Sequence, residues 1–185
     1  MIKTMLKAGT QFYPNPAILA SCGPVEKPNI ITLAWVGTLC SAPPMLGIGV
    51  RPSRYSHGLI KASGEFVINV PTAAMVRVTD YCGQVSGRDV DKFATTGLRG
   101  EPATAVSTVA IVECPLSIEC RVTEVLTLGS HDLFLAKVLA VQASPEILDS
   151  KGNIDLAKAD PLAFGNNQYW SLGQLLGTYG YSVRE

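Results

Sequence analysis

Residues 29–71 read "NIITLAWVGTLCSAPPMLGIGVRPSRYSHGLIKASGEFVINVP", and this stretch decides the fold. Residues 29–37 are rich in β-branched side chains and predict one strand, and residues 45–50 predict another after a Pro-Pro turn. Residues 56–64 predict a short helix that a glycine stops, and residues 65–70 predict a strand that ends before a proline. This order of elements contains no regular β-α-β alternation.

The segments on either side continue the same pattern. Residues 17–22 predict a further strand, whereas residues 72–83 and 88–97 have the apolar spacing of short helices. Residues 108–143 predict a long-armed β-hairpin whose turn lies just before His131. Because strands dominate the outer thirds and helices lie between them, we expect a mainly β fold, a closed antiparallel barrel with a few flanking helices.

Residues 160–183, "DPLAFGNNQYWSLGQLLGTYGYSV", form an aromatic and glycine-rich tail. An exposed Tyr169-Trp170 pair would make a sticky surface patch, so we expect the tail to pack against something. Phe164, Tyr169 and Trp170 are also suited to closing a subunit interface.

Composition limits the class of protein. The 185 residues suffice for one domain with a full core, and no repeat or linker divides residues 1–185. Hydrophobic residues make up 47% and charged residues 16%, which excludes disorder, and the net charge of zero without a basic stripe argues against nucleic-acid binding. No apolar window approaches the roughly 18 residues of a membrane span or resembles a signal segment, so we expect a soluble, cytoplasmic protein.

Motifs of several enzyme classes are missing from the sequence. The five cysteines lack paired metal-binding spacing, so reduced buried thiols are expected and no metal site is predicted. There is no G-x-G-x-x-G dinucleotide fingerprint, no complete P-loop, no G-x-S-x-G and no H-E-x-x-H. With only two histidines there is little room for a hydrolytic triad.

Residues 49–60, "GVRPSRYSHGLI", have the composition of an anion site. A strand ends at Val50, a proline turns the chain, and Ser53 or Ser56 opens a helix whose free N–H groups favour a phosphate. Arg51 and Arg54 add charged, bidentate donors. The alternative is an ordinary serine N-cap with solvated arginines, which this stretch alone does not exclude.

The same residues resemble a known family. Residues 29–71, "CGQVSGRDVDKF" (82–93), "GSHDLFLAKVLAV" (129–141) and "PLAFGNNQYWSLG" (161–173) are similar, in this order, to segments of the flavin reductase-like, FMN-binding split-barrel proteins, most of all the flavoredoxin-like members. The resemblance implies a homodimer of six-stranded Greek-key barrels with one FMN near the interface in each subunit.

The resemblance also implies roles for individual residues. Asn29 and Trp35 lie on the strand that lines the flavin ring, and main-chain groups of the Thr32–Ser41 segment, including Thr38 and Cys40, meet the ring edge. The phosphate is implied to lie at Arg51, Ser53, Ser56 and the helix amides, with Lys92 at the phosphate or ribityl chain. Two residues are implied near the ring, Phe164 on its face and His131 at the ring or its partner site. The family usually has threonine where this chain has Ser56, and serine keeps the hydroxyl.

The implied activity is electron transfer from NADH or NADPH through FMN to an acceptor, which is a redox protein, ferric iron, oxygen or free flavin. His131 is the candidate proton donor, because only histidine titrates near physiological pH without a large shift. Two alternatives remain open. One is a non-catalytic FMN electron carrier reduced by a partner protein, and the other is a split barrel that binds a non-flavin ligand. Arg54, Tyr55 and His57 have no assigned role.

Overall fold

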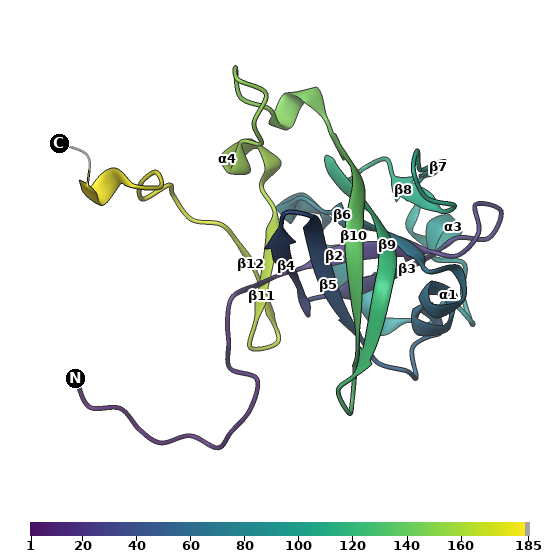
Figure 1. Cartoon of the computed structure of the whole chain (residues 1–185), viewed down its shortest axis with the longest axis horizontal. Helices are drawn as coiled ribbons and strands as arrows, with labels where there is room; N and C mark the ends of the chain where they lie inside the picture. The colour runs from purple at the N-terminus through teal and green to yellow at the C-terminus, as the bar shows by residue number, and fades with distance from the viewer. Residues whose placement is uncertain (184–185) are drawn as a thin grey trace.

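The computed structural model describes residues 1–183 and is mainly β, as predicted. Seven antiparallel strands form the principal sheet in the order β3-β2-β6-β9-β10-β5-β4. Their bounds are β2 Ile18–Cys22, β3 Asn29–Leu33, β4 Val36–Ser41, β5 Pro44–Val50, β6 Glu65–Val70, β9 Leu116–Thr127 and β10 Asp132–Ala143. The hairpin expected within residues 108–143 is the β9–β10 pair, which forms the long central ribbon of the barrel (Figure 1).

The prediction of one strand over residues 29–37 is wrong, because the chain bends at Ala34 and Trp35. The bend divides this segment between β3 and β4. β3 pairs with β2 and β4 pairs with β5, at opposite ends of the sheet. One straight strand cannot pair at both ends. The bend therefore lets the sheet curl, and β3 comes beside β5 to close a split barrel.

Two small sheets and seven helical segments complete the chain. The small strands are β1 Asn15–Pro16, β7 Gly100–Pro102, β8 Val109–Ile111, β11 Leu162–Gly165 and β12 Gln168–Ser171. The α-helices are α1 Tyr55–Ser63, α2 Val76–Gln84, α3 Lys92–Thr96 and α4 Leu156–Ala159. Short 3-10 turns are η1 Ala73–Met75, η2 Pro145–Ile147 and η3 Tyr181–Val183. The helix predicted over residues 88–97 begins only at Lys92, because the Asp91 carboxylate accepts a hydrogen bond from Ala94 N and starts it there.

Apolar side chains pack on both faces of β2. Ile18 and Ala20 point into the barrel with Phe66 and Phe134, whereas Leu19 faces a second core under α2 and α3 with Ile30. α2 and α3 thus cover one outer side of the barrel, and β3 is the wall between them and the interior.

The aromatic tail is only partly packed. β11 pairs with β1 and β12 pairs with β11, so residues 162–171 are packed in part as expected, but Trp170 remains 56% exposed. Beyond them the chain runs away from the barrel on the same side as the N-terminal segment (Figure 1). Leu175 and Leu176 there are 82% and 84% exposed.

Candidate functional site

A cavity of about 360 Å³ lies where the β3–β4 bend, the end of β5, the start of α1, α2 and the β11–β12 hairpin meet. Five residues predicted from the sequence line it: Thr32, Trp35, Arg51, His131 and Phe164. The other lining residues are Ile31, Leu33, Ala34, Gly49, Val50, Arg54, Gly83 and Asn167. Segments far apart in the chain therefore converge on one site.

Two glycines let the walls of this cavity approach closely. A Cβ at Gly49 would lie 3.1 Å from Trp35 Cβ, and Gly49 N donates to Trp35 O at 2.8 Å. A Cβ at Gly83 would lie 3.2 Å from Thr32 Cβ, and the Thr32 hydroxyl donates to Thr79 O on the same helix. The β3–β4 bend and α2 are thus held as fixed walls.

One end of the cavity is cationic. Arg51 follows β5, and Arg54 N donates to Arg51 O at 3.0 Å in a tight turn. The predicted serine cap is wrong, because the N-cap of α1 is Arg54, and no side chain accepts a hydrogen bond from the helix start. The positive end of the helix dipole therefore lies beside two arginines without a capping oxygen. Ser53 lies exposed in the turn.

Lys92 lies directly behind this wall and is 4% exposed. Its Nζ donates to Ile30 O and Cys82 O, both at 2.7 Å, and each acceptor precedes a residue that lines the cavity. Within residues 1–183 no carboxylate forms an ion pair with Lys92. Burial lowers the pKa of Lys92, and burial raises the pKa of the neighbouring Cys82 thiol to about 11, so this thiol is neutral at pH 7.

Asn29 and Ser56 lie deeper than the sequence suggested. Asn29 Nδ2 donates to Ser56 Oγ at 2.8 Å, and both side chains are buried. This bond joins β3 to the first turn of α1. Neither side chain lines the cavity, so the place of Asn29 beside a flavin ring and the contact of Ser56 with a phosphate both stay predictions.

His131 lies at the cavity rim, at the end of the β9–β10 turn. Ser130 Oγ and His131 Nδ1 are 2.9 Å apart. Burial and then the charge of Arg51 lower the pKa of His131 below 6.5. The imidazole is therefore mainly neutral at pH 7, which does not favour it as a proton donor there.

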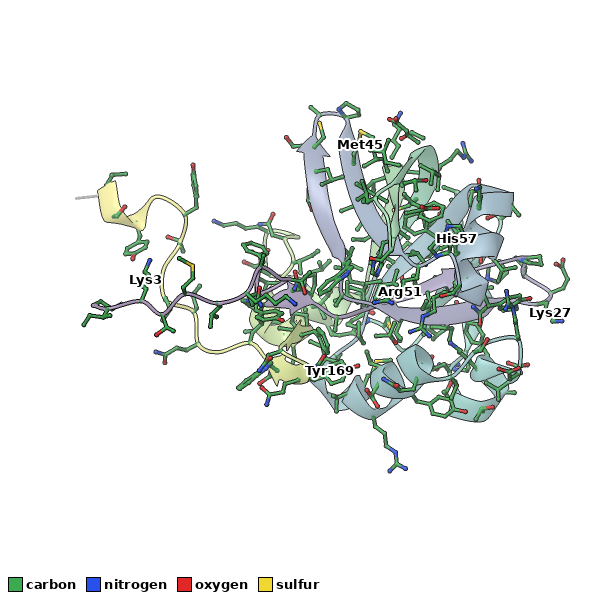
Figure 2. All side chains as sticks on the ribbon, turned by 90° about the horizontal axis from the view of Figure 1, so that it is seen from below. Lys3, Lys27, Met45, Arg51, His57 and Tyr169 are labelled. Carbon is green, nitrogen blue, oxygen red and sulfur yellow. The ribbon has the colours of Figure 1, made fainter. Side chains whose placement is uncertain are left out.

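Thr38, Cys40 and Ser41 do not line this cavity. They lie on β4, at the end of the principal sheet, and Cys40 pairs with Met45 near the tip of the β4–β5 hairpin. Figure 2 shows Met45 at the far end of this hairpin from Arg51. Their implied contacts with a flavin ring stay predictions.

A second cavity of about 390 Å³ adjoins the first and shares Thr32, Ala34, Gly83, Phe164 and Asn167 with it. Its own residues are Ala17, Asp80, Gln84 and Tyr169. Tyr169 OH donates to Asp80 Oδ1 at 3.2 Å, and the Phe164 and Tyr169 rings meet edge to face. Among the described residues 1–183, no arginine or lysine lines this second space, so the linings of the two cavities differ in charge.

Sequence reasoning offered Arg54 as a charged donor but left it without an assigned role, and it missed Gly83 and Asn167 as cavity residues. Asn166 and Asn167 both have positive φ, 50° and 59°, as a tight β-hairpin turn demands. The "NN" between two apolar segments was a usable turn signal. Nothing local marks Gly83, because its role is only to let α2 approach β3.

Three kinds of comparison agree on the family. The model of the flavin reductase like domain matches residues 10–173. The flavoredoxin of Desulfovibrio vulgaris (Miyazaki F) is 31% identical, with a TM-score of 0.93 over 99% of this chain and 100% of that chain. Flavoredoxin from Methanosarcina acetivorans is 34% identical, with a TM-score of 0.89 over the whole of both chains.

A more distant relative, the FMN reductase (NADH) RutF of Stutzerimonas stutzeri, is 26% identical over 67% of this chain and 68% of that protein. The domain match spans both ends of the cavity, and the flavoredoxins share the complete fold. This chain therefore belongs to the flavin reductase-like domain family and is a flavin-related redox protein with the split-barrel fold.

Proposed function

We propose that the chain binds FMN in the first cavity, the one lined by Arg51 and Arg54, and that the bound FMN passes electrons from NADH or NADPH to an acceptor. The observation that carries this proposal is the buried, carboxylate-free Lys92 beside two arginines and an uncapped helix start. Isolated buried charges are unfavourable, so this arrangement favours a bound anion with more than one negative charge. A phosphate monoester is such an anion.

The rest of the cavity suits the remainder of FMN. The β3–β4 bend presents main-chain groups and Trp35 along one wall, and Phe164 provides an aromatic face. Bound FMN would supply a group that accepts a hydride and passes electrons on. The protein then has to bind, orient and shield it, and such positioning accounts for much of the rate in hydride transfer.

The second cavity is the proposed approach of the electron donor. It lies beside Phe164 and Thr32 and carries polar groups, and no described residue that lines it has a cationic side chain to compete for the phosphate. The name of the Stutzerimonas stutzeri relative, FMN reductase (NADH), supports a nicotinamide donor. The acceptor remains one of those named above: a redox protein, ferric iron, oxygen or free flavin.

The similarity to two flavoredoxins favours a second candidate, a carrier that a partner protein reduces. Stopped-flow mixing of the FMN-loaded protein with NADH and with NADPH separates the two. Bleaching of the flavin absorbance on the timescale of turnover supports the reductase. Absence of bleaching with both nucleotides, together with reduction by a redox protein, supports the carrier.

We also propose a homodimer with the cavities near the interface. Within residues 1–183, Met1, Ile2, Leu175 and Leu176 are largely exposed at the two extended ends. Such apolar side chains are stabilised by burial, and a second copy offers the matching surface.

The visible spectrum is the first test of the proposed function. The purified protein, or the protein incubated with FMN and desalted, is expected to be yellow and to release FMN on heating. A colourless protein that cannot be reconstituted with FMN would contradict the proposal and favour a non-flavin ligand.

Within residues 1–183, no group of three or more His, Cys, Asp or Glu side chains is placed to hold a metal ion.

A further inference from the structure

His57 and Asp132 form a buried pair next to the cationic end of the cavity. His57 Nε2 lies 2.8 Å from Asp132 Oδ2, and both residues are buried. The His57 ring packs edge to face on Phe134, with centroids 5.2 Å apart. The two residues are 75 positions apart in the chain, and neither lines the cavity.

Asp132 is attached to both ends of the turn that carries the arginines. Through the backbone it pairs with Val50, the last residue of β5. Through its side chain it holds His57, in the first turn of α1. The chain between these two anchors is residues 51–56, which contains Arg51 and Arg54.

The turn between these anchors is exposed. Residues 51–54 all lie at the surface, and the bonds Arg54 N to Arg51 O and His57 N to Arg54 O, both 3.0 Å, are internal to it. Such a segment has few contacts that would limit its motion. Figure 2 shows Arg51 and His57 at the two ends of this turn.

We propose that His57 and Asp132 are positioning residues that hold the Arg51–Arg54 turn in the phosphate-binding arrangement, and that they thereby determine selectivity for phosphorylated over unphosphorylated flavin. This inference rests on the proposed function. Groups that orient a ligand-binding residue remove conformational entropy before binding, so affinity is higher than for a loose turn. Only the phosphate needs this turn, because the β3–β4 bend and Phe164 belong to other elements.

The alternative is that the pair only stabilises the barrel. A buried charge left without its partner is destabilising, so single removal of His57 could lower stability by itself. Replacement of both partners by apolar groups of similar shape is close to neutral. The double variant His57→Phe/Asp132→Val meets this need, because phenylalanine can pack on Phe134 and valine suits a strand.

The test compares the dissociation constants of FMN and riboflavin, which differ only in the phosphate. In the double variant we expect the FMN preference to fall at least about tenfold, as is typical for residues that orient a binding group, with riboflavin affinity changed less than about threefold. His57→Gln keeps an uncharged N–H donor toward Asp132 and is expected to retain the preference. Glu119→Gln, which alters a buried carboxylate on β9 outside the cavity, is the matched control and should also retain it.

Four results would overturn the inference. An unchanged preference in the double variant means that the pair does not position the turn. An equal loss for FMN and riboflavin means that its role is general stability. A wild-type protein that binds both flavins equally removes the phosphate site, whereas one that binds neither flavin removes the proposed function as well.

Discussion

At the residue scale, the cationic side chains at the first cavity lie on one side of it. Arg51 and Arg54 line it, and Lys92 lies buried behind it, where its hydrogen-bond partners among the described residues are two carbonyl oxygens. Each cation raises the free energy of the others, so the arrangement is unfavourable without an anion and favourable with one. This is the physical reason for assigning the phosphate end here.

Replacing Arg51 by alanine tests this assignment. Arg51→Ala is expected to weaken FMN binding by about 1.5–3 kcal/mol, the usual contribution of a hydrogen bond to a charged group, and to leave riboflavin binding unchanged. Fluorescence titration measures both. Arg77→Ala, an exposed arginine that lines a different cavity from α2, is the control and should bind FMN normally. Equal FMN affinity in the two variants would place Arg51 in solvent.

At the element scale, the loop before α3 is packed unusually closely on β3 and α1. A Cβ at Gly87 would lie 1.9 Å from Asn29 Oδ1 and 3.2 Å from the Tyr55 ring. Arg88 in the same loop lies over that ring, 5.7 Å from its centroid. The loop therefore keeps Asn29 in place for its bond to Ser56. This bond fixes the position of the first turn of α1 relative to β3.

Gly87→Ala is expected to displace Asn29 and break this bond. The overpacking should lower the free energy of unfolding by about 1–3 kcal/mol and also weaken FMN binding. Chemical denaturation and FMN titration measure the two effects. Gly58→Ala is the control, because a Cβ there meets no atom within 4 Å and alanine favours the α1 helix by about 1 kcal/mol. If both alanine variants were equally stable, the close contact at Gly87 would be unimportant.

Glu119 on β9 fastens another loop to the barrel. Its buried carboxylate accepts from Thr104 N, the Thr104 hydroxyl, Ala105 N and Gln142 Nε2. Burial alone would raise the pKa of Glu119, but these hydrogen bonds outweigh it and hold the pKa below 4.5. Because the native pKa is the lower one, Glu119 stabilises the fold fully above pH 4.5, and this contribution is lost as the pH falls through the native pKa.

Glu119→Gln should therefore lower the free energy of unfolding by about 2 kcal/mol at pH 7, since an NH2 group replaces one carboxylate oxygen and one backbone amide loses its acceptor. The variant should also lose less stability than wild type as the pH falls from 5 through the pKa that Glu119 has in the folded protein. Urea unfolding at several pH values checks both, with wild type as reference. A variant whose stability falls with acid as steeply as wild type would show that Glu119 does not titrate in this way.

At the scale of the whole molecule, the barrel is compact and the two ends of the chain are not. β1, β11 and β12 hold residues 15–16 and 162–171, and beyond them apolar side chains are exposed on one side of the barrel (Figure 1). The proposed homodimer would cover Leu175 and Leu176.

A chain that ends at Gly173 tests the dimer. Loss of two buried leucines should weaken association by about 3 kcal/mol or more, on the order of 100-fold in the dimer dissociation constant. Analytical ultracentrifugation over a range of concentrations measures it. Leu156→Ser, an exposed leucine on α4, is the control and should dimerise normally. A monomeric wild type, or equal dissociation constants, would contradict the proposed interface.

The sequence by itself determined the kind and order of the main elements. β-branched runs, glycine and proline stops and the turn before His131 predicted most strands, α1 and the β9–β10 hairpin, because such local preferences act between near neighbours. The motifs around residues 29–71 also carried the family resemblance, and five of the predicted site residues line the cavity.

Only the tertiary structure decided how those residues are used. The bend at Ala34 and Trp35 arises because β3 and β4 pair at opposite ends of one curled sheet. Burial of Lys92 behind the cavity and the bond between His57 and Asp132 join residues 62 and 75 positions apart. No local preference encodes such contacts, because they depend on how the barrel closes and which surfaces that closure removes from water.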